Sequence, residues 1–319
     1  MLNILVIGAV NTTKHTINQL LKYDFNIVGV LGHEPLNKTK VSGWCDLEAL
    51  SKENKLPFKG FKKINDSENI IWASEKKPDI IFAVGFSQLM SEQWLQMPKL
   101  GCIGFHPTFL PKGRGRAPLA WIVLEQVTGS ATFFLMGEGA DDGPIFVQQT
   151  FEVEQNDDAT SVEEKIEKAI IKSLDDWLPK LKKGEWNPIP QNDIEASWYG
   201  KRAAEDGHIN WNNSAYSIDR LIKASTHPHP GAYSYFKDSK LIIWKSTLEQ
   251  NIPIQGVVGR VLLIDKEKGY LVQCGENHIW LNAIDIDAEL KIQIGDKLGY
   301  NIEDEIFQIK LFLKNLKNE

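Results

Sequence analysis

The feature that most constrains this chain is a series of short apolar runs in its first third, each ended by polar or turn-forming residues. Runs of this length suit strands that are covered on both faces, as in a parallel sheet. Helix-like stretches separate them, and strands that alternate with helices are typical of a doubly wound α/β fold. The runs cover residues 3–10, 25–32, 78–86 and 101–106.

The carboxyl ends of these strands are where we expect a ligand site, because ligands of open α/β sheets bind outside the carboxyl ends of the strands. Ser87 and His106 both fall at such ends. The turn after the first run contains Gly8 but lacks a GxGxxG motif, so a dinucleotide site is not expected there.

The middle of the chain predicts an edge hairpin followed by a long helix. Residues 131–153 contain two strand-like runs around a glycine-rich loop, which indicates a hairpin at one edge of the sheet. A helix pattern follows, for which Thr160 and Glu163 fit a capping box and Gly184 a terminating residue.

A change of pattern near residue 204 predicts a second domain. Residues 186–203 are rich in proline, asparagine and charge, which favours a linker between domains at 1–185 and 204–319. In the second domain one short helix precedes several short apolar runs separated by glycines. This spacing predicts a small, OB-like β-barrel.

Composition excludes several classes of protein. The net charge of −6 gives no sign of a nucleic-acid binder. Cys45, Cys102 and Cys274 are far apart, so we expect reduced thiols in a cytoplasmic protein and no metal site. The apolar start lacks a basic segment and a cleavage site, and no apolar run reaches the roughly 20 residues that span a bilayer.

His106 is the first candidate for chemistry. The following Pro107 holds it in an extended conformation, and an imidazole at a strand end is a candidate general base. A histidine satisfied in the core is the alternative. Asp141 and Asp142 lie in a later glycine-rich loop, where one carboxylate could orient the imidazole. A solvated turn is the alternative for this pair.

Three segments together resemble a known family. In order and spacing, residues 103–121, 128–145 and 205–236 resemble the formyltetrahydrofolate-dependent formyltransferases. That family includes methionyl-tRNA formyltransferase and the sugar-nucleotide N-formyltransferases. The resemblance implies a Rossmann-like formyltransferase domain followed by a small β-barrel domain, with 10-formyltetrahydrofolate as co-substrate and no metal.

The resemblance also implies the catalytic residues and shows two departures. His106 and Asp141 match the family's catalytic His and Asp, but Gly104 stands where the family has an Asn that bonds the developing oxyanion. Loss of one such donor costs about 100- to 1,000-fold in turnover. Three alternatives follow for this chain: another group donates to the oxyanion, the site is rearranged, or the enzyme is impaired. Gly113 replaces the family's aromatic residue before Arg-Gly.

Residues 84–91 match the stretch that lines the family's pterin pocket. From the sequence alone, core packing is the alternative for this stretch. The folate-binding residues that the resemblance implies are Phe86, Ser87, Gln88, Leu89 and Met90, together with Gly139, Ala140 and Asp141 of the later loop.

Charge favours a nucleotide-linked amino sugar over tRNA as acceptor. That the reaction belongs to a pathway that makes a surface polysaccharide is what the resemblance to the family implies. Residues 204–319 hold 13 lysines and arginines against 16 aspartates and glutamates, and RNA affinity depends on neutralised phosphates. We expect Lys112, Arg114 and Arg116 to meet the diphosphate, or to form a solvated loop. Methionyl-tRNA formylation, hydrolysis of formyltetrahydrofolate, and a non-catalytic relative that binds folate or a sugar nucleotide remain alternatives. Neither a membrane nor a nucleic acid is an expected partner, and the oligomeric state stays open.

Overall fold

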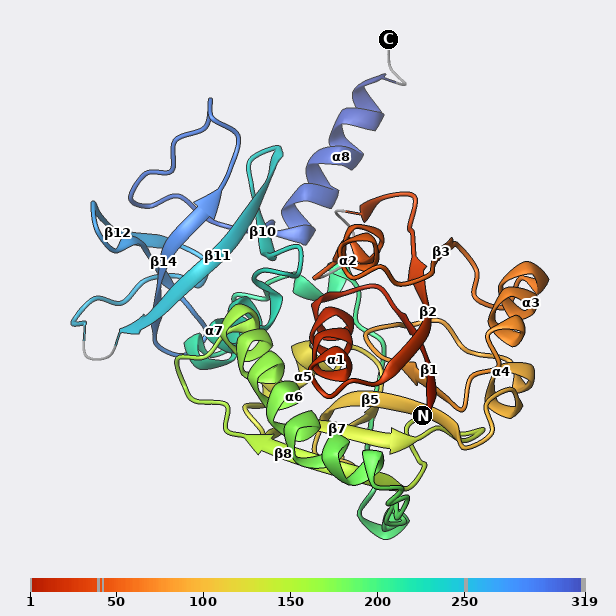
Figure 1. Cartoon of the computed structure of the whole chain (residues 1–319). Helices are drawn as coiled ribbons and strands as arrows, with labels where there is room; N and C mark the ends of the chain where they lie inside the picture. Colours follow the sequence, from red (N-terminus) through yellow and green to blue (C-terminus); the bar gives the residue numbers. More distant parts are fainter. Residues whose placement is uncertain (1, 39–40, 42, 250–251, 317–319) are drawn as a thin grey trace. The chain divides into compact units, whose positions relative to one another are not determined.

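The structure is a computed structural model that describes residues 2–38, 41, 43–249 and 252–316. The chain packs as two compact units, Met1–Arg202 and Ala203–Glu319 (Figure 1). The domain limits expected from the sequence, 1–185 and 204–319, stay a prediction.

The first unit is built on a seven-stranded sheet in the order β3-β2-β1-β4-β5-β7-β8. The five strands from β3 to β5 are parallel, while β7 and β8 are antiparallel and form the edge hairpin. The predicted doubly wound α/β fold is confirmed. The strands are β1 (Asn3–Gly8), β2 (Asn26–His33), β3 (Phe58–Phe61), β4 (Ile80–Ala83), β5 (Gly101–Thr108), β7 (Gly129–Leu135) and β8 (Ile145–Phe151).

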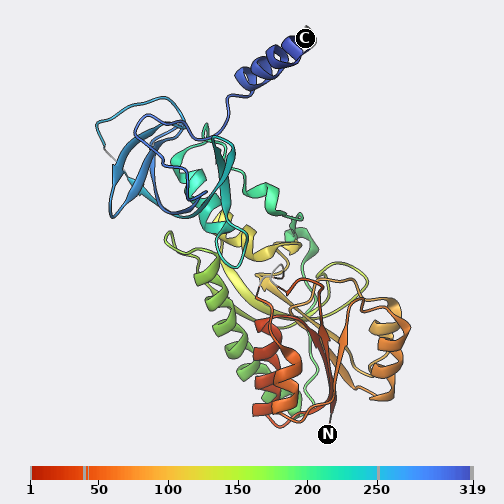
Figure 2. The same ribbon diagram turned by 90° about the horizontal axis from the view of Figure 1, so that it is seen from above.

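Helices cover both faces of this sheet, which explains why the central strands β1 and β4 are apolar and buried (Figure 2). On one face, Trp177 of α6 packs against Phe82 and Phe133. On the other, Trp94 of α4 shares a buried cluster with Leu5 and neighbouring strand residues. The helices of this unit are α1 (Asn11–Lys22), α2 (Leu47–Glu53), α3 (Ser67–Glu75), α4 (Glu92–Gln96), α5 (Pro118–Glu125) and α6 (Ala159–Lys182).

The start of α6 differs from the expected capping box. The helix begins at Ala159, and the N-cap is Asp158, whose carboxylate accepts from the backbone N–H of Ser161 at 2.9 Å. Ser161 Oγ in turn accepts from the backbone N–H of Asp158 at 3.0 Å. The cap therefore lies earlier than Thr160 and Glu163 predicted, because Asp is a strong N-cap residue. Gly184 adopts a left-handed φ of +86° just beyond the helix, as predicted.

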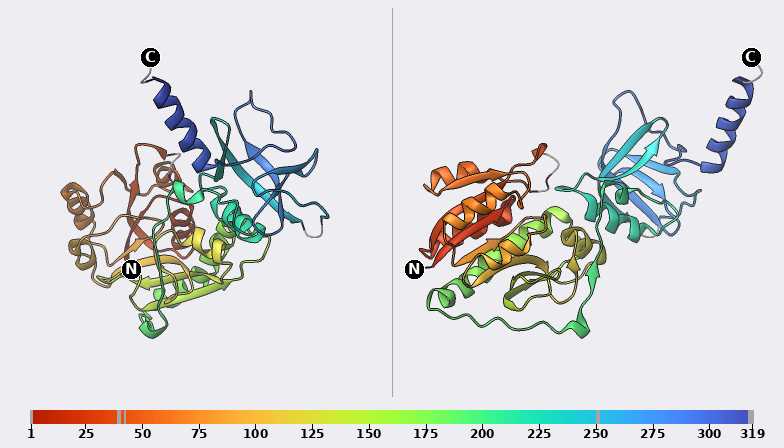
Figure 3. Two further views of the ribbon diagram at one scale, coloured as in Figure 1. Left: turned by 180° about the vertical axis from the view of Figure 1, so that it is seen from behind. Right: turned by 90° about the vertical axis from the view of Figure 1, so that its right-hand side faces the viewer.

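The segment after α6 runs back along the first unit (Figure 3). Ile189 pairs with Ile145 next to the sheet. Farther on, β9 (Trp198–Tyr199) pairs in parallel with β6 (Arg114–Gly115). A short 3₁₀ helix, Asp193–Glu195, lies between these pairings. We call residues 186–202 the strap, because its backbone is tied to the loop that follows His106.

The second unit contains a five-stranded antiparallel sheet in the order β10-β11-β14-β13-β12. Residues 295–299 lie between its two end strands: Val261 donates its backbone N–H to Asp296, and Gly299 donates to Tyr235. This closes the sheet into the expected barrel-like form. The elements are the 3₁₀ helix Ala204–Gly207, α7 (Ala215–Ser225), β10 (Ala232–Phe236), β11 (Ser239–Glu249), β12 (Val261–Asp265), β13 (Gly269–Gln273), β14 (His278–Asp285) and α8 (Ile302–Leu316).

Two features are absent from the residues that the structure describes. No helix among them is long and apolar enough to cross a membrane. No group of three or more His, Cys, Asp or Glu side chains among them is placed to hold a metal ion.

Candidate active site

His106 lies near the carboxyl end of β5, where only 5% of it is exposed. Its Nε2 is 2.9 Å from the carbonyl oxygen of Gly113. A carbonyl can only accept a hydrogen bond, so Nε2 carries the proton. In the neutral ring Nδ1 is then left with its lone pair, which is the state a general base requires.

Asp141 approaches the opposite side of the same ring. Its Oδ2 lies 3.5 Å from His106 Nδ1 and accepts the backbone N–H of Gly115 at 2.9 Å. Asp141 has a left-handed φ of +56° in the loop after β7, whereas its neighbour Asp142 is exposed. The structure therefore brings together the imidazole and the carboxylate that the sequence singled out. A proton taken up at Nδ1 would face a carboxylate.

Burial sets the resting charge of the imidazole. Desolvation lowers the pKa of His106 below its ordinary value, although the Asp141 carboxylate and the Gly113 carbonyl act to raise it. The ring is therefore neutral near pH 7. A neutral imidazole with an unprotonated Nδ1 can accept a proton from an attacking amine, and Asp141, 3.5 Å from Nδ1, then stabilises the cation that forms.

The strap supplies three residues that fix this arrangement, and sequence reasoning missed all of them. Ser197 Oγ accepts the backbone N–H of Gly113 at 2.9 Å. Gln191 Nε2 donates to the carbonyl oxygens of Asp141 and Gly143 at 2.8 and 2.7 Å. The sequence signal was a polar, proline-rich stretch, which is also the signature of a linker.

The third strap residue, Tyr199, explains why position 113 is a glycine. Gly113 has a φ of +72°, and a Cβ there would lie 2.6 Å from the ring of Tyr199. Tyr199 stacks on Trp121 and donates its hydroxyl to Glu125 at 2.7 Å. An aromatic ring does occupy this region, but it comes from the strap and not from the loop.

Gly104 is also accounted for by a neighbouring ring. It lies two residues before His106 on the same face of β5, paired with Phe134 of β7. A Cβ at position 104 would lie 2.7 Å from Cζ of Phe134 and 3.0 Å from Cγ of Met136. Both neighbours belong to the buried wall beside the site, so the space for an asparagine side chain is filled by apolar atoms.

The basic residues after His106 divide into two kinds. Arg114 is 3% exposed, and its guanidinium donates to Gln191 Oε1 at 2.9 Å and to Asp193 at 2.7 Å. It therefore ties the loop to the strap. Lys112 and Arg116 are exposed, so their charged groups are accessible to a ligand.

The segment predicted to bind the pterin follows β4 at the same edge of the sheet. Phe86 packs edge-on against Phe61, and Met90 packs against the buried cluster below it. Gln88 reaches back, accepting from Ile64 N and donating to the carbonyl of Lys62.

The remaining folate-binding predictions lie on exposed surface. Leu89 is 88% exposed, so its side chain makes little contribution to the core. Ser87 is exposed, as are Gly139 and Ala140 in the loop that carries Asp141. The folate roles of all these residues stay predictions.

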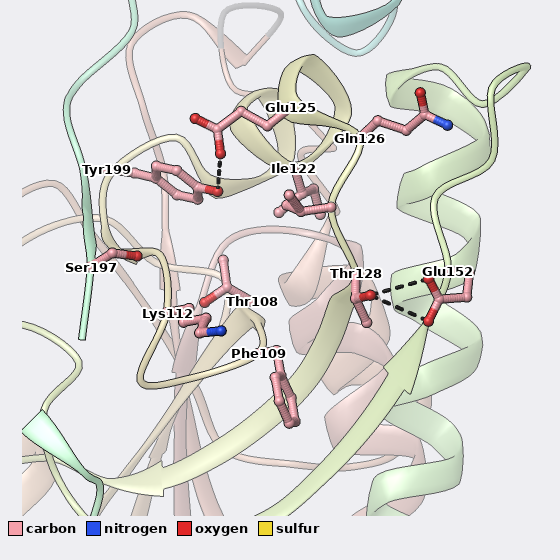
Figure 4. A pocket seen from close by; sticks show the side chains of 11 residues that line it. Thr108, Phe109, Lys112, Ile122, Glu125, Gln126, Thr128, Glu152, Ser197 and Tyr199 are labelled. Carbon is pink, nitrogen blue, oxygen red and sulfur yellow. Dashed lines mark hydrogen bonds between the residues drawn. The ribbon is translucent and has the colours of Figure 1, made fainter. Parts of the chain in front are cut away.

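A pocket of about 500 Å³ lies beside the loop that follows His106 (Figure 4). Thr108 and Lys112 form one side, and Glu125 and Tyr199 another. Thr108 shares the Gly113 carbonyl with His106, because its hydroxyl donates to that oxygen at 3.3 Å. Two hydrogen bonds that share the Gly113 carbonyl therefore connect the pocket to the imidazole. Its lining is completed by Phe109, Ile122, Gln126, Val127, Thr128, Glu152 and Ser197.

Comparison with known families now bears on this site. The family model described as formyl transferase matches residues 2–177, more than half of the chain. The chain belongs to the formyltransferase family. The model of the formyl transferase C-terminal domain matches residues 201–298. The chain thus contains both parts of the family's architecture, as the sequence resemblance implied.

Individual relatives agree with this assignment. The formyltransferase is 36% identical over 231 residues to the bifunctional polymyxin resistance protein ArnA of Wigglesworthia glossinidia brevipalpis. That match covers 72% of this chain but only 35% of ArnA, so the chain spans about a third of that relative.

Two solved structures show the same fold. One is the N-formyltransferase from Helicobacter canadensis, in complex with folinic acid and dTDP-3-aminofucose (TM-score 0.68, 19% identity, 88% of this chain and 99% of that one). The other is methionyl-tRNA formyltransferase from Clostridium thermocellum (TM-score 0.54, 17% identity, 79% and 96%). Because the fold serves both acceptor classes, it does not identify the acceptor of this formyltransferase.

Proposed function

We propose that this formyltransferase moves a formyl group from 10-formyltetrahydrofolate to the amine of a nucleotide-linked amino sugar, in a cytoplasmic step of surface polysaccharide synthesis. The observation that carries the chemistry is the state of His106. Its Nε2 proton is held by the Gly113 carbonyl, and its basic Nδ1 faces Asp141.

The proposed reaction is acyl transfer. A neutral amine attacks the formyl carbonyl, and the carbonyl oxygen becomes an oxyanion. His106 Nδ1 takes the amine proton, directly or through a water, while Asp141 stabilises the imidazolium. The oxyanion then collapses, the bond from the formyl carbon to the folate nitrogen breaks, and that nitrogen receives the proton held by His106, directly or through a water, as tetrahydrofolate leaves.

Charge and exposure support the acceptor class. The excess of acidic residues in 204–319 gives this part of the chain little affinity for phosphate-rich RNA. Lys112 and Arg116 are exposed on the loop next to His106, where they can meet a diphosphate. The Helicobacter relative was crystallised with a dTDP-linked amino sugar and folinic acid, which is consistent with this acceptor and with a folate donor.

One observation favours a second candidate. Phe134 fills the space beside Gly104, so residue 104 supplies no oxyanion donor. A relative that binds folate or a sugar nucleotide without turnover would tolerate that loss. We favour the enzyme, because the buried His106 lies beside Asp141 and the strap bonds the loops that carry both, through Ser197 to Gly113 and Gln191 to Asp141.

The decisive experiment incubates the protein with 10-formyltetrahydrofolate and a panel of amino-sugar nucleotides, and follows each by mass spectrometry. We expect one of them to gain a formyl group, with the His106→Ala variant as the inactive control. If methionyl-tRNA were formylated and no amino-sugar nucleotide were, the acceptor would be tRNA and the proposed acceptor class would be wrong. Folate binding with no turnover on either substrate class would favour the non-catalytic relative.

A further inference from the structure

The helix α8 presents an apolar seam to solvent. Five of its residues follow the spacing 4-3-4-3, which is the a/d repeat of a coiled coil. Their exposed fractions lie between 46 and 69%. The apolar face of an amphipathic helix usually packs against a core, whereas this face of the 15-residue α8 does not. Figure 2 shows α8 apart from the sheet of its own unit. The seam consists of Ile302, Ile306, Ile309, Leu313 and Leu316.

α8 is an addition to the family's C-terminal domain, whose match ends at residue 298. The chain leaves the barrel through Gly299, which donates to Tyr235, and Tyr300, which stacks on Tyr235. Asn301 then bonds the side chain of Asp304 in the first turn of the helix. The base of α8 is therefore attached to the folded barrel.

A 3.5-residue seam is complementary to another helix with the same repeat. Phe312 adjoins the seam at a g position and is also exposed, whereas the exposed Phe307 and Leu311 fall at b and f positions on the other side of α8. A continuous apolar surface of this kind marks an interaction site.

Charges along α8 indicate a second copy of this chain as the partner. The first turn holds Glu303, Asp304 and Glu305, whereas Lys310 and Lys314 lie toward the other end. Two copies side by side in the same direction would place the acidic first turns next to each other and leave Glu305 alone, at a g position, to meet Lys310 of the other copy. Two copies in opposite directions place acids against lysines, and the helix dipoles then also oppose.

We propose that α8 pairs with α8 of a second copy as an antiparallel two-helix coiled coil and thereby makes the formyltransferase a dimer. In the heptad set by the seam, Glu303 and Lys310 each directly follow a d residue, so both lie at e positions. In an antiparallel pair e positions face each other, so Glu303 meets Lys310 of the other copy. The proposal is independent of the acceptor substrate.

The first test is sedimentation of the full chain over a range of concentrations. We expect a reversible dimer, which Ile309→Asp weakens about tenfold or more because it places a charge in the seam. The matched control is Gln308→Asp, one residue away and off the seam, which should leave the dimer intact. Far-ultraviolet circular dichroism and thermal unfolding check that both variants remain folded.

The second test establishes orientation by charge exchange. Lys310→Glu should weaken the dimer, and Glu303→Lys added to Lys310→Glu should restore it. Restoration by Glu305→Lys instead would mean a parallel pair and overturn the antiparallel arrangement. A monomer at every concentration, or a dimer unaffected by Ile309→Asp, would refute self-association through α8. Binding of the monomer to anionic phospholipid vesicles, lost in Ile309→Asp, would reassign the seam to a membrane surface.

Discussion

The ring of Phe134 lies where a side chain at position 104 would have to go: a Cβ on Gly104 would be 2.7 Å from Phe134 Cζ. Position 104 is two residues from His106, on the face of β5 that carries the imidazole. The space for an amide side chain at position 104 is therefore occupied by Phe134. A substitution at position 104 alone cannot restore the oxyanion donor.

We accordingly expect Gly104→Asn to lower activity. The added side chain must displace Phe134, which is 3% exposed, and overpacking of this kind typically costs about 1–3 kcal/mol of stability. Combining it with Phe134→Leu, which removes the far end of the ring, should reduce the cost of the asparagine. A double-mutant cycle on kcat/KM and on the free energy of unfolding measures this coupling. A large gain in activity from Gly104→Asn alone would mean that the site has lost its donor without being rebuilt.

His106→Ala and Asp141→Asn should each lower turnover, because the first removes the base and the second removes the charge that stabilises its protonated form. Loss of a general base typically costs about 100- to 10,000-fold. The double variant should be little worse than His106→Ala, since the two residues act as a unit. Steady-state kinetics on the three variants, with thermal unfolding as the control for folding, measures this. Full activity of His106→Ala would refute the mechanism.

The pH profile follows from the lowered pKa of His106. The base works when neutral, so the acidic limb of kcat/KM should have its midpoint below the ordinary histidine value of about 6.5. Asp141 raises this pKa, so Asp141→Asn should move the midpoint to still lower pH. The unfolded chain binds a proton at His106 more readily than the folded one, so the stability contribution of His106 falls as pH drops below about 6.5. A midpoint above 6.5 that Asp141→Asn does not move would assign the limb to another group.

Leu89→Arg should weaken folate binding strongly and leave the protein folded. An 88% exposed leucine makes little contribution to the core, so its replacement should change stability by about 0.5 kcal/mol or less. Folate affinity can be followed by titration calorimetry, with thermal unfolding in parallel. Unchanged affinity in a folded variant would move the pterin site away from this segment.

Replacing the exposed basic residues after His106 should have a different effect from replacing the buried one. Arg116→Ala and Lys112→Ala should raise the KM for the nucleotide sugar with little change in stability, because both residues are exposed. Arg114→Ala should instead destabilise the protein by about 1–3 kcal/mol, since it removes a buried charge bonded to Gln191 and Asp193. KM and the melting temperature are measured for all three variants. A change in KM alone indicates contact with the ligand, and a lower melting temperature indicates that the residue stabilises the loop.

Local patterns were sufficient to predict the sheet, the edge hairpin and the barrel, because strand burial and turn chemistry are written in neighbouring residues. The resemblance to the formyltransferases implied that His106 and Asp141 share one site, whereas the residues alone left a core histidine and a solvated turn open. Local patterns did not predict the roles of Phe134, Gln191 and Tyr199, whose significance arises only from contacts with residues far away in the chain. α8 was missed as well, since its apolar repeat lies among charges at the end of a segment that otherwise forms strands.

The strap makes the protonation state of His106 a long-range property of the polypeptide. The Gly113 carbonyl that selects the tautomer belongs to a residue whose N–H is held by Ser197, 84 positions later. A fragment ending at residue 185 would retain the imidazole, the carboxylate and the Thr108 hydrogen bond to that carbonyl, yet it would lose the Ser197 hydroxyl that holds the N–H of Gly113. The smallest piece of this chain with a defined base therefore extends to Arg202, and any dissection or fusion of the enzyme has to respect that boundary.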